Sequence, residues 1–423
     1  MIVVRNARVA TMNGAQPDQG DGPLGLIEDG AVAIGEDGKI AYVGASADAP
    51  TGDSLDARGA RVAARIIDAR GALLTPGLIE PHTHLLFAGD RAGEHAARLA
   101  RTSYLEIARA GGGIASTVRA TRAASDEELV LGARARIDRL ARGGVTTVEV
   151  KSGYGLSVAE ELRLLRLIRA AAVDAPCEVV PTLLGLHAVP QDTDRGSWVR
   201  AVVEELTPEA ARLGLARGCD AFCEQGAFTP AECRAALEAG ARAGLVPHLH
   251  ADQLTEGGGA ELAAGLRCAS ADHLERTSDA GVAALARAGT AAVLLPLAAW
   301  FLRETRPAQA ALFLLGGVPV ALGGNLNPGT QRIESVSLLL AAGCLLAGLT
   351  PAQALWACTA GGARALRLDD RGRLAPGLRG DLVLWATRDP AHLPYHAGVE
   401  HAALVVRAGR VCLDLRGELT VEC

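Results

Sequence analysis

The chain has 423 residues, with 42 basic and 48 acidic side chains that leave a formal net charge of −6. This mildly acidic balance argues against a nucleic-acid or anionic-membrane partner. The nine cysteines are scattered without CxxC pairs, so we expect reduced thiols in a cytoplasmic protein. Apolar segments are too short or too interrupted for a signal peptide or a membrane span.

Short strands are predicted near both ends of the chain. Within residues 1–72, "IVVRNARVATM", "GAVAIGEDGKIAYVG" and "RIIDARG" alternate apolar and polar positions, which is typical of hairpins. From residue 371 the pattern returns in "DLVLWAT" and "ALVVRAGRVCLD". We expect the two segments, 1–72 and 371–423, to pair into one small β-sandwich domain.

The middle of the chain, residues 73–370, alternates short apolar runs with helical stretches rich in Ala, Leu and Arg. Eight such units predict an α/β fold, a (β/α)8 TIM-type barrel whose chemistry gathers at the carboxyl ends of the strands. The eight runs are, in order, "LLTPGLIEPHTH", "TTVEVKSGYG", "CEVVPTLLGLHAVP", "DAFCEQG", "LVPHLHAD", "CASADHLE", "AAVLLPLAA" and "VPVALGGNLNPG".

Six of the ten histidines fall at the ends of these runs. They are His82, His84, His187, His248, His250 and His273. Two pairs, in "EPHTHL" and "PHLHAD", are two residues apart, so both rings of a pair point to one side of an extended strand. Imidazoles that meet at one barrel rim can hold a divalent metal, and the pattern predicts a metal-dependent hydrolase. For any single histidine, His248 above all, a hydrogen-bonded core residue is the alternative.

Three further residues near predicted strand ends suit binding or catalysis. Arg91 in "FAGDRAG" could clamp a carboxylate, or it is an ordinary surface arginine. Tyr154 in "KSGYGL" stands between two glycines that would let the backbone approach a ligand, or it packs within its loop. Lys151 could be carboxylated and bridge two metal ions.

Several stretches resemble the imidazolonepropionases, a family of the amidohydrolase superfamily. They are "LTPGLIEPHTHLLFAGDR", "SYLEIARAGGGIASTVRATR", "VEVKSGYGL", "PTLLGLHAVP", "HADQL", "SADHLE", "LLP" and "NPGT". The resemblance implies hydrolysis of 4-imidazolone-5-propanoate to N-formimidoyl-L-glutamate in histidine degradation, with one zinc or iron ion per chain. It also implies a small-molecule substrate that carries a carboxylate, and homodimers are usual for the family.

The resemblance assigns roles to individual positions. The metal ligands would be His82, His84, His250 and the residue at 325. His273 matches the histidine beside the reacting carbonyl. The positions that hold substrate or product are Arg91, Tyr154, His187, Gln253, Asn327, Gly329 and Thr330.

The chain departs from the family at the eighth strand end, where "TDxNPG" is usual and "GGNLNPG" is found. Asn325 can offer an oxygen to a metal but cannot accept a proton, so the general base is missing. Gln253 likewise stands where a glutamate often does in related hydrolases. Asp272 and Asp252 are the nearest carboxylates in the sequence that could substitute.

Three interpretations follow. The chain is an imidazolonepropionase that works with Asn325, with His273 as its proton carrier. It is instead a catalytically impaired relative that still binds metal or ligand. Or it is a dinuclear amidohydrolase of another cyclic amide, with Lys151 carboxylated. A metal count and a turnover assay distinguish them.

Overall fold

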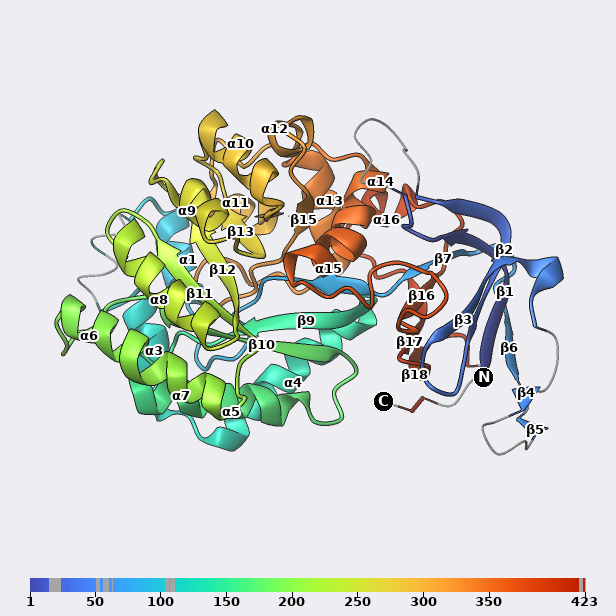
Figure 1. Ribbon diagram of the computed structural model, residues 1–423, viewed down its shortest axis with the longest axis horizontal. Helices are drawn as coiled ribbons and strands as arrows, with labels where there is room; N and C mark the ends of the chain where they lie inside the picture. Colours follow the sequence, from blue (N-terminus) through green and yellow to red (C-terminus); the bar gives the residue numbers. More distant parts are fainter. Residues whose placement is uncertain are drawn as a thin grey trace.

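The computed structural model describes residues 1–14, 24–50, 64–102, 106, 111–417 and 421–422, with the backbone of two short strands, β4 (Ser54–Leu55) and β5 (Arg61–Val62). Two large sheets organise the chain, one in the helix-covered body and one at the side where both termini lie (Figure 1). Part of one stretch on which the family resemblance rests, residues 103–105 and 107–110, lies outside the described residues.

The first large sheet is parallel and follows the order of the chain. Every strand coincides with one of the eight predicted runs, so the barrel prediction is confirmed. The strands are β8 (Leu78–Glu80), β9 (Val145–Lys151), β10 (Glu178–Leu186), β11 (Gly218–Cys223), β12 (Val246–Ala251), β13 (Ser270–His273), β14 (Ala291–Leu294) and β15 (Val320–Leu322).

The barrel closes between the segments that follow its first and last strands. Thr83 and Leu326 form a parallel bridge, and the N–H of His84 donates to the carbonyl of Leu326 at 2.9 Å. The N–H of Asn325 donates to the carbonyl of His82 at 2.9 Å. The loop after β15 therefore lies directly beside the histidine pair after β8.

Helices connect and cover the barrel strands (Figure 1). Capping boxes begin three of them: Ser125 with Glu128, Thr229 with Glu232 and Thr350 with Gln353 satisfy the first free N–H groups. The helices are α1 (Ala92–Leu99), α3 (Ile114–Ala123), α4 (Asp126–Arg142), α5 (Val158–Ala172), α6 (Arg195–Ala201), α7 (Thr207–Arg212), α8 (Pro230–Arg242), α9 (Gly259–Gly265), α10 (Asp279–Ala288), α11 (Pro296–Leu302), α12 (Ala310–Leu315), α13 (Val336–Leu345), α14 (Pro351–Trp356) and α15 (Gly362–Ala365), with π-helical turns η2 (Val202–Leu206) and η3 (Ala357–Gly361).

The helix α13, which contains no charged residue, is buried on most of its residues, as expected for a core helix. Among the described residues, no helix combines the length and the apolar character needed to cross a bilayer.

The second large sheet is mixed and combines strands from both chain ends. β7 pairs antiparallel with β16, and Lys39 forms an antiparallel bridge with Arg379, so strands near the two chain ends share this sheet. The order is β18-β17-β16-β7-β1-β2-β3, with β6 on β1. The strands are β1 (Ile2–Ala10), β2 (Leu26–Ile34), β3 (Ile40–Ala45), β6 (Arg65–Asp68), β7 (Leu73–Pro76), β16 (Leu382–Trp385), β17 (Ala402–Arg407) and β18 (Arg410–Asp414), and the short helices η1 (Ser46–Asp48) and α16 (His392–Tyr395) lie in the same terminal segments.

The run "LLTPGLIEPHTH" was treated as one barrel strand, but the structure divides it. Leu73–Pro76 belongs to the mixed sheet, and the barrel strand begins at Leu78. Gly77 connects β7 of the mixed sheet to β8 of the barrel. A Cβ at this position would lie 2.1 Å from Oγ1 of Thr146 on β9, so the backbone can pass there only as glycine. The change of sheet therefore depends on a residue without a side chain.

Within the described residues seven cysteines are free thiols, and all of these but Cys344 are buried. Burial raises the pKa of several of these thiols, for example Cys344 to about 11, so they are unreactive. Cys412 is disulfide-bonded, so the expectation of reduced thiols is wrong at that position.

Candidate metal centre

Three buried histidine side chains converge at the carboxyl ends of β8 and β12. His82 and His84 follow β8, and His250 lies in β12. The Nε2 atoms of His82 and His84 are 3.3 Å apart, and those of His84 and His250 are also 3.3 Å apart. Ligand atoms of all three lie within 4.8 Å of one another. The fold thus brings together imidazoles from distant parts of the sequence.

The spacing of these nitrogen atoms fits a divalent cation. In a tetrahedral zinc site with Zn–N bonds of about 2.0–2.1 Å, the ligand nitrogens lie about 3.3 Å apart. All three imidazoles are buried, so their nitrogen atoms are held at this spacing by the surrounding barrel. The donor set can therefore hold one divalent metal ion.

Two of the three imidazoles have a buried carboxylate behind them. Nδ1 of His82 is 2.6 Å from Oδ2 of Asp272, and Nδ1 of His250 is 2.9 Å from Oδ2 of Asp220. A carboxylate at Nδ1 favours the proton on that atom, which leaves the Nε2 lone pair free for a metal. The carboxylates thus select the tautomer that a ligand needs.

Lys151, at the end of β9, lies beneath the histidines among carboxylates. Its Nζ is 2.8 Å from Oε1 of Glu149, 2.8 Å from Oδ2 of Asp220 and 3.7 Å from Oδ2 of Asp272. Burial lowers the pKa of Lys151, but Asp220, Glu149 and Asp272 outweigh burial and raise the pKa above its ordinary value. Carboxylation of a lysine needs the neutral amine, so these contacts disfavour that modification.

Burial also determines the charge of the three converging imidazoles. It lowers the pKa of His82 and of His84 well below the ordinary value, and nearby positive groups add to the effect. The pKa of His250 is lowered as well, with burial the largest cause. Neutral imidazole is the form that binds metals, so the site has the correct protonation at neutral pH.

His273 ends β13 in a backbone conformation that non-glycine residues rarely adopt. Its φ is +83°, and that of Leu274 is +69°. Such strain tends to occur where a side chain must be directed into a site. The ring centroid of His273 lies 5.5 Å from that of His250 and 5.9 Å from that of His82. Its Nδ1 is 3.6 Å from Oε1 of Glu275.

The loop after β15 is held by its own amide groups. Asn325 has a φ of +55°, and Nδ2 of Asn327 donates to both its backbone carbonyl, at 2.7 Å, and its Oδ1, at 3.2 Å. Oδ1 of Asn327 accepts from the N–H groups of Gly329 and Thr330, each at 2.8 Å. The loop therefore holds the backbone of Asn325 against that of His82, while Oδ1 of Asn325 contacts Asn327.

Arg91 lies against the same loop. A Cβ built on Gly329 would be 2.0 Å from Nη1 of Arg91, so only glycine permits this approach. Nε of Arg91 is 2.8 Å from Oε2 of Glu94, and Nη2 of Arg98 donates to the carbonyl of Gly329 at 2.7 Å. Only 11% of the Arg91 side chain is exposed, which separates it from an ordinary surface arginine.

His187 and Tyr154 line the other side of the histidine cluster. The His187 ring stacks on His84 with centroids 5.1 Å apart, and its centroid is 5.3 Å from that of Tyr154. Nδ1 of His187 is 2.9 Å from the carbonyl of Gly153, so Nε2 remains free to accept. Burial lowers the pKa of His187 to about 4. Gln253 is half-buried in the turn beyond His250.

His248 is a hydrogen-bonded core residue, the alternative to a metal-site role that the sequence left open. Its Nδ1 is 3.0 Å from Oγ of Ser270, and burial lowers its pKa to about 3. The remaining histidines lie apart from this cluster: His95 stacks on Phe301, and His392, His396 and His401 stack on one another.

Asp252 does not take the place of the missing carboxylate. Its oxygens accept from the N–H groups of Gly259, at 2.9 Å, and Ala260, at 3.1 Å, and so hold the first turn of α9. Its side chain is committed to the backbone.

Three acidic residues of the centre were not assigned chemistry in the sequence analysis: Asp220, Glu149 and Glu80. Each lies in a barrel strand among apolar residues. Glu80 is two residues before His82, and Glu149 is two residues before Lys151. A charged residue inside an apolar strand was the available signal, but its partner comes from another strand.

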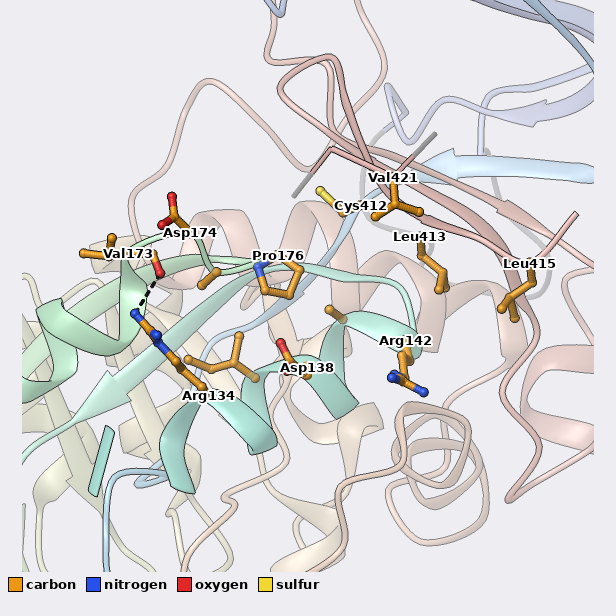
Figure 2. Close-up of a pocket in the computed structure, with 13 residues that line it drawn as sticks. Arg134, Asp138, Arg142, Val173, Asp174, Pro176, Cys412, Leu413, Leu415 and Val421 are labelled. Atoms are coloured by element: carbon orange, nitrogen blue, oxygen red, sulfur yellow. Dashed lines mark hydrogen bonds between the residues drawn. The ribbon is translucent and has the colours of Figure 1, made fainter. Parts of the chain in front are cut away.

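A cavity of about 540 Å³ lies elsewhere, between α4, the segment before β10 and β18 (Figure 2). Its lining includes Arg134, Asp138 and Leu413, and Nη2 of Arg134 donates to the carbonyl of Val173 at 3.2 Å. The helix α4 precedes β9 and the segment 173–176 precedes β10, so the cavity lies near the amino ends of these barrel strands, with β18 of the mixed sheet on its other side. None of the candidate site residues lines this cavity.

Comparison with known proteins agrees with this geometry. The pattern described as "Amidohydrolase family" matches residues 346–412. An imidazolonepropionase of Anaeromyxobacter dehalogenans is 52% identical over 100% of this chain and 98% of its own length, and one of Myxococcus xanthus is 48% identical over 97% of both. An imidazolonepropionase of Geobacillus kaustophilus is 45% identical over 92% of both.

Solved structures share the fold at low sequence identity. A 5-methylcytosine deaminase from Klebsiella pneumoniae superposes with a TM-score of 0.70 at 18% identity, over 100% of this chain and 98% of that one. An atrazine chlorohydrolase from Arthrobacter aurescens, in complex with zinc, gives 0.68 at 20% identity, over 98% of this chain and 95% of that one. The full-length identity to several named relatives, together with the barrel and its histidine cluster, shows that the chain belongs to the imidazolonepropionase family of hydrolases.

Proposed function

We propose that this chain hydrolyses the imidazolone ring of 4-imidazolone-5-propanoate to N-formimidoyl-L-glutamate. The observation that carries the proposal is the convergence of His82, His84 and His250 at one barrel rim, in a chain 52% identical to an imidazolonepropionase over its full length. The substrate is a small molecule with a carboxylate.

His82, His84 and His250 would hold one zinc or iron ion, with the amide oxygen of Asn325 as the fourth candidate ligand. A metal ion bound there lowers the pKa of water and polarises the ring carbonyl. Asp272 and Asp220, through the Nδ1 atoms of His82 and His250, keep both imidazoles in the ligand tautomer.

Arg91 would hold the propionate group of the substrate with its guanidinium fork. Its position beside the loop that carries Asn327, Gly329 and Thr330 supports a pocket that these residues share. Tyr154, His187 and Gln253 would orient the ring from the opposite side, His187 through its free Nε2.

The reaction adds one water: its oxygen bonds to the ring carbonyl carbon, the C–N bond breaks, and the leaving nitrogen takes up a proton. His273 would move that proton, since it lies next to the histidine cluster with Glu275 behind its Nδ1. Asn325 cannot accept a proton. Losing a positioned base costs about 10²–10⁴ in rate, so we expect slow turnover compared with a chain that has an aspartate at 325.

The dinuclear alternative is not favoured, because Lys151 is engaged as an ammonium by Glu149 and Asp220. A catalytically impaired relative that still binds metal or ligand differs from an active enzyme only in whether the purified protein turns over the imidazolone. The homodimeric assembly that the family resemblance implies and the cytoplasmic location expected from the cysteine pattern stay predictions.

The test is metal analysis and turnover of the purified protein beside an Asn325→Asp variant. We expect one metal equivalent per chain and measurable wild-type turnover of the imidazolone, with a rate increase of about 10²–10⁴ in the variant. Wild-type turnover at the uncatalysed rate, with activity only in the variant, would identify the impaired relative. Two metal equivalents would favour the dinuclear enzyme.

A further inference from the structure

Asp220 and Asp272 occupy equivalent positions behind two of the three candidate ligands. Each carboxylate is fully buried, and each has its Oδ2 within 2.9 Å of an imidazole Nδ1. Asp220 is on β11 and Asp272 on β13, the strands on either side of the one that carries His250. Neither Nδ1 of His250 nor Nδ1 of His84, the third candidate ligand, has a partner with full hydrogen-bond geometry in the described part of the chain, but Nδ1 of His250 still lies 2.9 Å from the Asp220 carboxylate.

The barrel fixes these carboxylates from several directions. Oδ1 of Asp220 accepts from the N–H groups of Ala221, at 2.7 Å, and His250, at 3.2 Å. Lys151 contacts Asp220 Oδ2 at 2.8 Å and lies 3.7 Å from Asp272 Oδ2, so one ammonium lies between the two carboxyl groups. Their orientation is therefore set before any cation binds.

Because Asn325 is neutral, the two carboxyl groups behind the imidazoles become important for the charge around a bound metal ion. A cation held by three neutral imidazoles and a neutral amide has no anionic ligand. Asp220 and Asp272 contact the side chains of two of its candidate ligands, each at one imidazole Nδ1. Carboxylates in that position raise the basicity of the ligand and fix its ring, and their loss commonly weakens metal affinity about 10–100-fold.

We propose that Asp220 and Asp272 are positioning residues that supply, from behind His250 and His82, the anionic charge that Asn325 does not supply at the metal. The inference rests on the proposed metal centre. It predicts that a carboxylate at position 325 and a carboxylate at position 220 substitute for one another in metal binding.

The experiment is a two-residue cycle on the full-length, metal-stripped protein, with the dissociation constant for Zn²⁺ measured by competition with a chromophoric chelator. We expect Asp220→Asn to weaken zinc binding about 10–100-fold. Asn325→Asp alone should tighten binding, and the double variant should return to within a few-fold of wild type.

Asp252→Asn is the matched control. Asp252 is as buried as Asp220 and lies just beyond β12, the strand that carries His250, but its oxygens hold the N–H groups of α9 rather than an imidazole. The zinc affinity of Asp252→Asn should equal that of wild type. A loss of affinity in Asp220→Asn but not in Asp252→Asn would then be due to the charge behind His250 and not to a general destabilisation of the barrel.

A dissociation constant for Asp220→Asn within about twofold of wild type overturns the inference, and so does a double variant that stays as weak as Asp220→Asn. Should Asp220→Asn not fold, Asp272→Asn removes the equivalent charge behind His82 and replaces it in the cycle. Wild-type protein that binds no zinc or iron would instead refute the proposed metal centre itself, so the two failures are distinguishable.

Discussion

Both carboxylate oxygens of Glu80 lie 2.9 Å from the backbone nitrogen of Gly324, which joins the first barrel strand to the loop after the last. Oε1 of Glu80 also accepts from the N–H of His82 at 3.0 Å. One buried side chain therefore positions the backbone of a candidate metal ligand and the residue before Asn325. Burial raises the pKa of Glu80 to about 8, although both N–H donors oppose that shift.

Gly324→Ala should destabilise the protein. A Cβ at position 324 would lie 2.8 Å from Oε2 of Glu80, whose oxygens are already held by the backbone. Overpacking of this kind costs about 1–3 kcal/mol in free energy of unfolding. Chemical denaturation of wild type, the two single variants Gly324→Ala and Glu80→Asp, and the double variant measures it. The shorter aspartate should recover part of the loss, and a double variant less stable than both single variants would contradict this account.

Gly329→Ala should impair substrate binding. The new methyl group would lie 2.0 Å from Nη1 of Arg91, so the guanidinium must leave its place beside the loop. Because Arg91 is proposed to bind the propionate in ground and transition states alike, we expect KM to rise about tenfold or more with a smaller change in kcat. Steady-state kinetics on the imidazolone measures both constants.

Gly93→Ala is the control for that variant. Gly93 lies in α1, close to Arg91 in sequence, and a Cβ there meets nothing within 4 Å. Its KM should be unchanged. An equal rise in both variants would show that the helix, and not the position of Arg91, determines the effect.

His248→Asn should make stability less dependent on pH. Burial lowers the folded-state pKa of His248 to about 3, whereas the unfolded value is near 6.5. Between these values the unfolded chain binds more protons, so wild type loses stability as the pH falls below about 6.5. At about 1.4 kcal/mol per pH unit, the loss attributable to His248 reaches about 2 kcal/mol at pH 5.

Denaturation of wild type and His248→Asn at pH 7.5 and pH 5 measures this difference. Asparagine can keep a hydrogen bond to Ser270, so the variant should fold. Comparing the two proteins cancels the titration of the other buried imidazoles. A wild-type curve that changes with pH no more than the variant's would show that His248 is not held neutral by the fold.

The sequence by itself determined the barrel and most of the cluster at its rim. Alternating runs and helices fix which segments become parallel strands, and their carboxyl ends must meet at one edge. The spacing of His82 from His84 therefore predicted a shared direction for their rings, and His250 could be added because its run also ends at that edge. The departure at Asn325 was visible in the sequence alone.

Only the tertiary structure decided what lies behind those rings. Asp220, Lys151 and Asp272 come from three strands, and nothing local to any one of them indicates which atoms it faces. The change of sheet at Gly77 and the contact between Glu80 and Gly324 likewise depend on how the two edges of the barrel meet. Local sequence sets the period and direction of a strand, whereas the partner of a buried charge is set by register and closure of the whole sheet.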